Sequence, residues 1–335
     1  MNPPRIRLAQ LPTPLVCMER LSGELGGPRI WLKRDDLTES AASGNKLRKL
    51  EYSIGEALAQ NATVLITAGG IQSNHCRATA IVAARLGLKS HLLLVGKPPS
   101  PADGNLLLDT LAGAVITFVS MDEFRHLDDQ FLNIANEYRP RGEVPFNIPI
   151  GASDEIGLWG YIECARELKD DFEHQNLDPG YVISAAGSGG TLGGLILGNH
   201  LHHLDTNMVA FNVCDDEAWF VQKISGDIER WQQRYRSNIP PIQAEELGIN
   251  IIDGYVGPGY ARADQHVYDT IKRVARTEGI FFDPVYTGKA FDAMLQEYSN
   301  GRFNDTADIV FIHTGGIYGL FPLRDQFYKA STAKP

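Results

Sequence analysis

The stretch "VISAAGSGGTLGG", Val182–Gly194, joins a short apolar run to a helix-like segment through a glycine-rich turn. The apolar run before Gly187 is typical of a buried strand. Glycine permits positive φ and close backbone approach, and the free N–H groups and dipole at a helix start favour an anion. The stretch predicts an anion cradle made of Gly187, Ser188, Gly189, Gly190 and Thr191. A turn that merely lets a helix pack would have the same composition.

A second junction of this kind is "LITAGGIQSNH", Leu65–His75. We expect a strand that ends at Ala68, a turn at the two glycines, and a helix that begins around Ser73, Asn74 and His75. The start of that helix forms a second anion cradle. His75 could stack on a ligand or transfer a proton, or it could be an ordinary polar residue in the first turn of a helix.

Apolar runs like the one before Gly187 recur along the chain: "ATVLITA", "SHLLLV", "AVITFV", "VPFNIPI", "YVISAA", "NMVAFNV" and "DIVFIHT". They alternate with amphipathic segments such as "SNHCRATAIVAARLG" and "YIECARELKDDFE". Strand alternating with helix predicts a mostly parallel, wound α/β sheet, in which ligands bind at the carboxyl ends of the strands. There is no repeat and no long linker, so we expect any second domain to be nested within the first.

The chain matches neither the dinucleotide-binding motif nor the P-loop motif. In the first stretch the third glycine of a G-x-G-x-x-G pattern is replaced by Leu192. A P-loop is absent because Lys289, in "TGKA", is followed by Ala290 and lacks the upstream glycine. The cradle therefore suits a single phosphate group.

The stretch "SGNKLRKLEY", Ser43–Tyr52, holds three basic residues. In a helix over 45–58, Lys46 lies about 70° from the centre of the apolar stripe, whereas Arg48 and Lys49 lie roughly 130° away. We expect Lys46 alone to lean inward and the other two to face solvent. A partly desolvated lysine at a helix start has a lowered pKa, which suits Schiff-base chemistry. The alternative is a snorkelling surface lysine.

The composition of the chain limits the classes of molecule that it is expected to bind. The chain has 335 residues, 43% of them hydrophobic, and a formal net charge of -10, which disfavours nucleic acid and anionic membranes as partners. Its four cysteines are far apart and predict neither a zinc site nor disulfides. The histidines of "HLHH", His200, His202 and His203, could suggest a metal, but no matching ligand set accompanies them and we expect a solvated helix end. With no long apolar run, we expect a cytoplasmic protein.

Four further phrases place polar groups beside glycine or proline turns: "DGYVGPGYARAD", "DPVYTGKAF", "IPIGASDEIGLWGY" and "FIHTGGIYGLF". They contain Tyr260, Tyr286, Thr287 and Thr314. Taken singly, each of these residues could be an ordinary residue at the edge of a core.

Together the phrases resemble the D-cysteine desulfhydrase and 1-aminocyclopropane-1-carboxylate deaminase family of pyridoxal phosphate enzymes. The likeness runs from Leu11 to "GLFPL" near the C-terminus and rests on "PTPL", "IWLKRDD", "SGNKLRKLEY", "AGGIQSNH", "GSGGT", "DGYVGPGY", "EGIFFDPVYTGKA" and "HTGG", in the family's order. The chain departs from the family at Ser43, usually a glycine, and at Leu192.

The resemblance implies a two-domain, tryptophan-synthase-β-like α/β fold (fold type II), each domain an open, twisted, mostly parallel sheet flanked by helices. Residues 1–50 and 159–335 would form the large domain, which binds pyridoxal phosphate, and residues 51–158 a smaller inserted domain. Members of the family are usually homodimers.

The resemblance also implies roles for the candidate residues. Lys46 would be the Schiff-base lysine and, once released, the base; Gly187 to Thr191 would form the phosphate cup. Asn74 would donate a hydrogen bond to the phenolate oxygen of the cofactor, and Ser73, Asn74 and His75 would receive the substrate carboxylate. Tyr260 and Tyr286 would lie near the reacting carbons, and Thr287 and Thr314 near the cofactor.

The expected reaction is β-elimination of D-cysteine to pyruvate, ammonia and hydrogen sulfide. In the related deaminases the positions of Thr287 and Thr314 hold glutamate and leucine, whereas the D-cysteine enzymes have threonine at both. The alternatives are a lyase or deaminase acting on another small amino acid, such as L-cysteate or 1-aminocyclopropane-1-carboxylate, and a protein that binds the cofactor without catalysis.

Overall fold

A computed structural model describes residues 3–236, 242 and 247–328. The described residues contain two β-sheets. The larger has six strands in the order β1-β2-β10-β7-β8-β9, and the smaller has four in the order β5-β4-β3-β6. Every paired strand runs parallel to its neighbour except β1, which is antiparallel to β2. The wound, mostly parallel α/β architecture is therefore confirmed.

The strands are β1 Leu15–Cys17, β2 Arg29–Lys33, β3 Val64–Gly70, β4 Lys89–Val95, β5 Val115–Val119, β6 Pro145–Asn147, β7 Tyr181–Ala186, β8 Asn207–Asn212, β9 Asn250–Ile252 and β10 Asp308–Ile312. The α-helices are α1 Glu19–Leu25, α2 Asn45–Ala59, α3 Asn74–Arg85, α4 Gly104–Leu111, α5 Met121–Arg125, α6 Leu127–Tyr138, α7 Trp159–Gln175, α8 Gly190–His202, α9 Glu217–Tyr235, α10 Gln265–Glu278 and α11 Thr287–Ser299. The 3₁₀ segments are η1 Asp35–Leu37, η2 Arg139–Arg141, η3 Ile150–Ala152 and η5 Ile317–Tyr328.

All seven apolar runs form strands, so that prediction is confirmed. The sequence missed β1, β2 and β9. β1 and β9 have only three residues each, and β2 begins and ends with a basic residue, so none shows a long apolar run. The expected end of β3 at Ala68 was also wrong, because the strand continues through Gly70.

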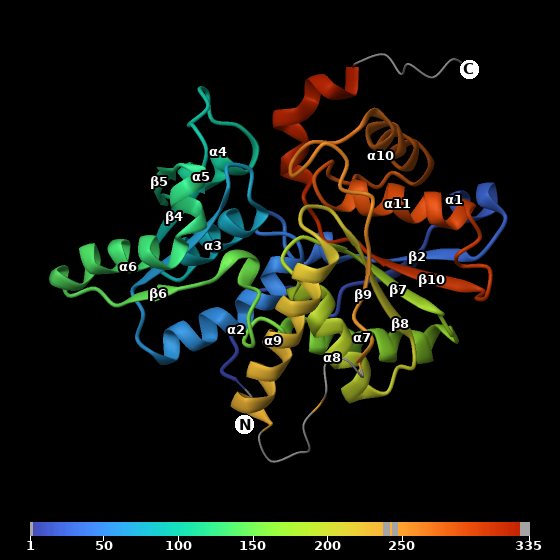
Figure 1. Ribbon diagram of the computed structural model, residues 1–335, viewed down its shortest axis with the longest axis horizontal. Helices are drawn as coiled ribbons and strands as arrows, with labels where there is room; N and C mark the ends of the chain where they lie inside the picture. Colours follow the sequence, from blue (N-terminus) through green and yellow to red (C-terminus); the bar gives the residue numbers. More distant parts are fainter. Residues whose placement is uncertain (1–2, 237–241, 243–246, 329–335) are drawn as a thin grey trace.

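Helices cover both faces of each sheet (Figure 1). On the large sheet, α7, α8 and α9 share one core, which includes Trp159, Leu195 and Trp231. Helices α1, α10 and α11 share the opposite core. In β3, Leu65 packs with α2 and α3, whereas the neighbouring Val64 packs with α6, because successive strand side chains point to opposite faces. In Figure 1 the small sheet with α3 to α6 forms the left lobe, and the large sheet the right lobe.

Helix α2 is buried on more sides than its apolar stripe predicts. Leu47, Leu50 and Ile54 are fully buried, as expected. The prediction that Arg48 faces solvent was wrong, because its side chain is 1% exposed. Its guanidinium donates to Asp35 and Glu167, each at 2.8 Å, and a buried charge is tolerated when it is paired in this way.

The predicted domain limits can be compared with the strands. The small sheet is built from strands between residues 64 and 147, whereas the first predicted limit, at residues 50 and 51, falls inside the continuous helix α2. The two limits stay a prediction.

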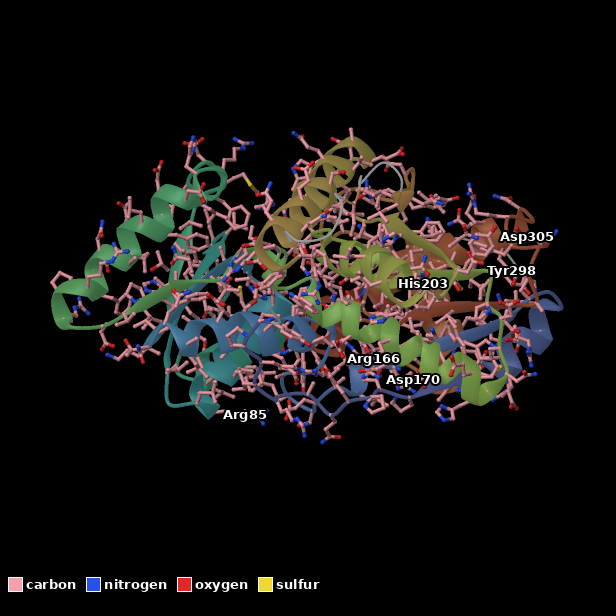
Figure 2. All side chains as sticks on the ribbon, turned by 90° about the horizontal axis from the view of Figure 1, so that it is seen from below. Arg85, Arg166, Asp170, His203, Tyr298 and Asp305 are labelled. Carbon is pink, nitrogen blue, oxygen red and sulfur yellow. The ribbon has the colours of Figure 1, made fainter. Side chains whose placement is uncertain are left out.

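The surface carries mixed charge. On α7, Arg166 donates to Asp170 one turn later at 2.9 Å, and Figure 2 shows both on that helix. Among the described residues, no helix combines the length and apolar character that a membrane span requires.

Candidate active site

The predicted residues converge where the carboxyl ends of strands from both sheets meet helix starts. The backbone before Lys46 packs directly against the segment after β10, since the Asn45 amide donates to the Thr314 carbonyl at 3.1 Å. Gly44 has φ of 112°, and a Cβ there would lie 2.7 Å from that same carbonyl oxygen. A Cβ at Gly315 would lie 2.8 Å from the Cα of Gly44. Glycine is therefore required on both sides of this contact.

Lys46 stands in the first turn of α2 and is half-buried. Its Nζ donates to Asn45 Oδ1 at 3.2 Å. Burial lowers the pKa of Lys46 from an ordinary 10.5 to about 8, while Asp283 and Cys214 act in the opposite direction. A larger share of neutral amine is thus present near neutral pH, which is what a nucleophilic lysine needs.

The glycine-rich turn lies between β7 and α8, as the sequence predicts, and its role as an anion cradle stays a prediction. Gly189 has φ of +80°, and α8 begins at Gly190. Ser153 Oγ accepts from the Gly190 amide at 3.3 Å and lies 2.8 Å from Ser188 Oγ. Thr191 Oγ1 accepts from the Asn45 side chain at 3.0 Å, which ties the cradle to the start of α2.

Lys49 belongs to this cradle, so the expectation that it faces solvent was wrong. Its side chain is fully buried, and its Nζ donates to Gly151 O at 3.0 Å and to Ser153 Oγ at 3.1 Å. A Cβ at Gly190 would lie 3.0 Å from that Nζ. Burial, together with Lys46 and Lys223, lowers the pKa of Lys49 well below 10.5. Among the described residues no carboxylate forms an ion pair with Lys49, so an anion in the cradle would supply its counter-charge.

The spacing of Lys46 and Lys49 could have indicated that Lys49 is buried, although the apolar stripe of the helix predicted the opposite. Lys49 follows Lys46 by three residues, so the two lie on neighbouring positions of one helix face. Ser153 lies in the phrase "IPIGASDEIGLWGY", but its contact with Lys49 joins two distant segments and no local pattern predicts it.

The start of α3 presents Ser73 and Asn74. Ser73 caps the helix, since its Oγ accepts from the Cys76 amide at 3.1 Å. Asn74 is half-buried, and its Oδ1 accepts from Arg77 at 3.1 Å. The His75 side chain is buried, with Nε2 2.8 Å from Thr67 Oγ1, so it points toward the small sheet. Its backbone N–H remains at the helix start, and its role toward a substrate stays a prediction.

Two tyrosines meet across this region. The hydroxyl oxygens of Tyr260 and Tyr286 are 2.7 Å apart. A Cβ at Gly187 would lie 2.8 Å from the Tyr286 ring, and a Cβ at Gly70 would lie 3.3 Å from the Tyr260 ring. Tyr286 therefore borders the cradle, and Tyr260 borders the end of β3. The Tyr260 side chain is exposed at its outer side, and partial loss of solvent around its hydroxyl raises its pKa to about 12; burial raises the pKa of the half-buried Tyr286 well above its ordinary 10.

Thr287, at the start of α11, is fully buried against Asp283. Its hydroxyl donates to Asp283 Oδ1 at 2.7 Å and accepts from the Asp283 amide at 2.9 Å. The Asp283 carboxylate also accepts from the amides of Val285, Tyr286 and Thr287 at 2.8 to 2.9 Å. With two donors on each oxygen, this carboxylate is fully engaged in capping α11.

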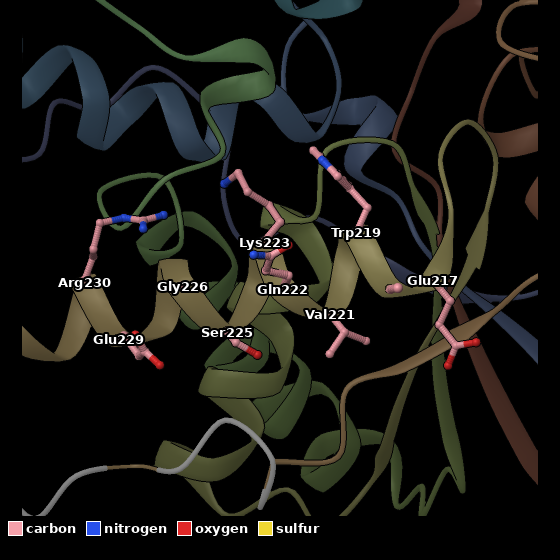
Figure 3. Close-up of a pocket in the computed structure, with 10 residues that line it drawn as sticks. Glu217, Trp219, Val221, Gln222, Lys223, Ser225, Gly226, Glu229 and Arg230 are labelled. Atoms are coloured by element: carbon pink, nitrogen blue, oxygen red, sulfur yellow. The ribbon is translucent and has the colours of Figure 1, made fainter.

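Two other features lie outside this region. A hollow of about 920 Å³ follows α9, and Figure 3 shows that the residues lining it stand on that helix; they include none of the predicted site residues. The histidines of "HLHH" stand at the end of α8, where His203 is exposed. Among the described residues, no group of three or more His, Cys, Asp or Glu side chains could hold a metal ion.

Known proteins are similar to this chain in sequence and in fold. The sequence pattern of the family described as "Pyridoxal-phosphate dependent enzyme" matches residues 6–315. A putative 1-aminocyclopropane-1-carboxylate deaminase from Thermotoga maritima is 41% identical over 95% of this chain and 97% of its own. The chain belongs to the family of pyridoxal-phosphate-dependent enzymes.

Further proteins that are similar to this chain support its place in the family. A bifunctional D-cysteine desulfhydrase/1-aminocyclopropane-1-carboxylate deaminase from Arabidopsis thaliana is 38% identical over 95% of this chain and 80% of its own. A D-cysteine desulfhydrase from Serratia proteamaculans is 36% identical over 96% of this chain and 97% of its own. A crystal structure of a 1-aminocyclopropane-1-carboxylate deaminase homologue has a TM-score of 0.83 and 34% identity, covering 97% of this chain and 95% of the other. This pyridoxal-phosphate-dependent enzyme is a lyase of fold type II.

The residues present fit pyridoxal phosphate. A phosphate group is bound by backbone N–H donors and a nearby basic group. The start of α8 offers such N–H groups, of which that of Gly190 donates to Ser153 Oγ, and Lys49 is the basic group. The aldehyde needs an amine with a lowered pKa, which Lys46 provides.

Proposed function

We propose that this pyridoxal-phosphate-dependent lyase eliminates sulfide from D-cysteine and forms pyruvate, ammonia and hydrogen sulfide. Lys46 would hold the cofactor, and the cradle from Gly187 to Thr191, with Lys49, would hold its phosphate. The cofactor supplies an electron sink for charge that develops at the substrate Cα.

The residues of the chain would then do the following. The N–H groups at the start of α3, with the Ser73 hydroxyl, would bind the substrate carboxylate, because a helix start favours an anion. The released Lys46 amine would take the Cα proton, for which its lowered pKa suits it. The Tyr260 and Tyr286 pair would stand beside the reacting carbons as neutral hydrogen-bond donors at neutral pH.

The observation that carries the choice of substrate is Thr287. Its hydroxyl is held by Asp283, and the carboxylate of Asp283 is itself fully engaged. Thr287 therefore offers a neutral group where the resembling deaminases have a glutamate. Without a carboxylate beside the ring nitrogen the electron sink is weaker, which disfavours opening a cyclopropane more than expelling sulfide.

A second candidate, 1-aminocyclopropane-1-carboxylate deamination, is favoured by the name of the Thermotoga relative at 41% identity. L-Cysteate elimination is a third outcome, since neither threonine excludes a sulfonate. Side-by-side kcat/KM values for D-cysteine, L-cysteate and the cyclopropane amino acid test the proposal. We expect D-cysteine to lead by at least about tenfold, with pyruvate and sulfide in equal amounts. A preference for either other substrate, or 2-oxobutanoate as the main product, contradicts it.

The Lys46→Ala variant is the matched control for product formation, and a protein that binds the cofactor without turnover would release no keto acid from any of the three substrates.

We also propose a cytoplasmic homodimer. The support for a second copy is an apolar face where α4 adjoins η5, with Leu107, Leu111, Ile317 and Phe321 each more than 40% exposed. Light scattering on the purified protein would give twice the mass of 36.9 kDa, and a monomer would contradict this proposal.

A further inference from the structure

Arg77 connects the segments that surround the start of α2. Its side chain is buried within α3, and its terminal nitrogens donate to Ser43 O at 2.6 Å, to Asn74 Oδ1 at 3.1 Å and to Asn105 Oδ1 at 2.6 Å. Its guanidinium carbon also lies 4.8 Å from the centre of the Tyr318 ring. Arg77 thus joins the loop before Lys46, the start of α3, helix α4 and segment η5.

The buried Arg77 guanidinium has no ion-pair partner among the described residues. Among the described residues, no carboxylate lies within ion-pair distance of Arg77, and neither oxygen of the buried Asp109 on α4 has a hydrogen-bond partner. Burial raises the pKa of Asp109 to about 8 and lowers that of Arg77 to about 10. Tyr318, Asp109 and Glu39 are the titratable groups that favour the charged form of Arg77. Arg77 is therefore a buried cation at neutral pH, and the acceptors that it contacts are neutral amide and carbonyl oxygens.

The contact with Arg77 fixes the orientation of the Asn74 side-chain amide. A guanidinium has five N–H donors and no acceptor, so only the amide oxygen of Asn74 can face it. The amide nitrogen of Asn74 must then point away from Arg77. Without Arg77, the two ends of the amide would have nearly the same shape and could exchange.

We propose that Arg77 is a positioning residue that holds the Asn74 amide so that its NH₂ group, and not its oxygen, is offered to the phenolate oxygen of pyridoxal phosphate. This inference rests on the proposed contact between Asn74 and that oxygen. A donor at this point withdraws negative charge from the phenolate oxygen, so the bound cofactor loses its proton at lower pH. An oxygen in its place would have the opposite effect.

The test is a titration of the visible absorbance of the holoenzyme against pH. We expect Arg77→Met to raise the midpoint by about one pH unit, a tenfold change in proton affinity, because one hydrogen bond to a charged group is lost. The matched control is Arg85→Met, since Arg85 stands at the other end of α3 with its side chain 47% exposed (Figure 2). Arg85→Met should leave the midpoint unchanged.

A double-mutant cycle separates positioning from general loosening of the fold. In an Asn74→Ala background, Arg77→Met should shift the midpoint no further, because it acts through Asn74. An unchanged midpoint in the single Arg77→Met variant, or an equal extra shift in the Asn74→Ala background, overturns the proposal.

Asn74→Asp provides a second route if Arg77→Met fails to fold. Asp keeps a partner for Arg77 but presents an acceptor to the cofactor, so the midpoint should again rise, and an unchanged midpoint overturns the proposal. The titration uses no substrate, so failure of the D-cysteine assignment would leave its result intact. If the wild-type protein developed no visible absorbance with the cofactor, the proposed role of Lys46 would fail instead.

Discussion

The hydroxyl oxygens of Tyr260 and Tyr286 lie 2.7 Å apart, although the two residues are 26 positions apart in the sequence. Lys289 maintains this relationship. It stands in the first turn of α11, three residues after Tyr286, and its Nζ donates to the carbonyls of Val256 and Gly259, both at 2.8 Å. The loop that carries Tyr260 is thereby tied to the helix that carries Tyr286, so the two tyrosines form one hydrogen-bonded unit.

We expect this unit to show non-additive kinetics. Tyr260→Phe and Tyr286→Phe should each lower kcat/KM by about 100-fold, an effect of the size seen when one well-placed hydrogen-bond donor to the reacting group is removed. The double variant should be no slower than the slower single variant, because either change breaks the shared hydrogen bond. Steady-state kinetics on the three variants measures this. Losses that multiply in the double variant would show that the tyrosines act separately.

Lys49 should determine cofactor affinity. Lys49→Met removes a buried ammonium at the cradle, so the cofactor should bind at least about tenfold more weakly, while saturating cofactor still restores the visible absorbance. Titration of cofactor-free protein, followed by tryptophan fluorescence, gives the Kd. Lys97→Met, at an exposed lysine, is the control and should leave the Kd unchanged. Equal Kd values for both variants would remove Lys49 from the phosphate site.

Cofactor capture should follow the titration of Lys46. Burial lowers its pKa to about 8, so the amine is mostly protonated below that pH and mostly neutral above it. The rate at which cofactor-free protein captures pyridoxal phosphate should therefore rise about tenfold per pH unit below pH 8 and level off above it. Stopped-flow absorbance between pH 6 and pH 10 measures the rate. A midpoint near 10.5, as for an exposed lysine, would contradict the lowered pKa.

The sequence predicted the strands well because parallel strands buried on both faces need continuous apolar runs. It also predicted the two strand-to-helix junctions, since glycine is required where β7 turns into α8. The placement of Arg48 and Lys49 could not be predicted in the same way. A hydrophobic stripe marks one buried face, but α2 is covered on its polar side too, by Asp35 and Glu167 around Arg48 and by Ser153 beside Lys49.

Glu167 lies 119 residues after Arg48 and Ser153 lies 104 residues after Lys49, so no local pattern contains these partners. The side-chain direction of His75 could not be predicted for a different reason: its partner Thr67 is only eight residues away, but the turn between strand and helix decides which side chains meet. Local periodicity thus located the helices, whereas the polar contacts between distant segments decided which charges are buried.

The central claim is that Lys46, and not its buried neighbour Lys49, carries the cofactor. Reduction of the holoenzyme with borohydride fixes the cofactor to whichever lysine holds it, and tandem mass spectrometry of a digest then identifies that residue. We expect a pyridoxyl group on Lys46 and none on Lys49, together with loss of the label in Lys46→Ala. A label on Lys49 or on any other lysine would contradict the account.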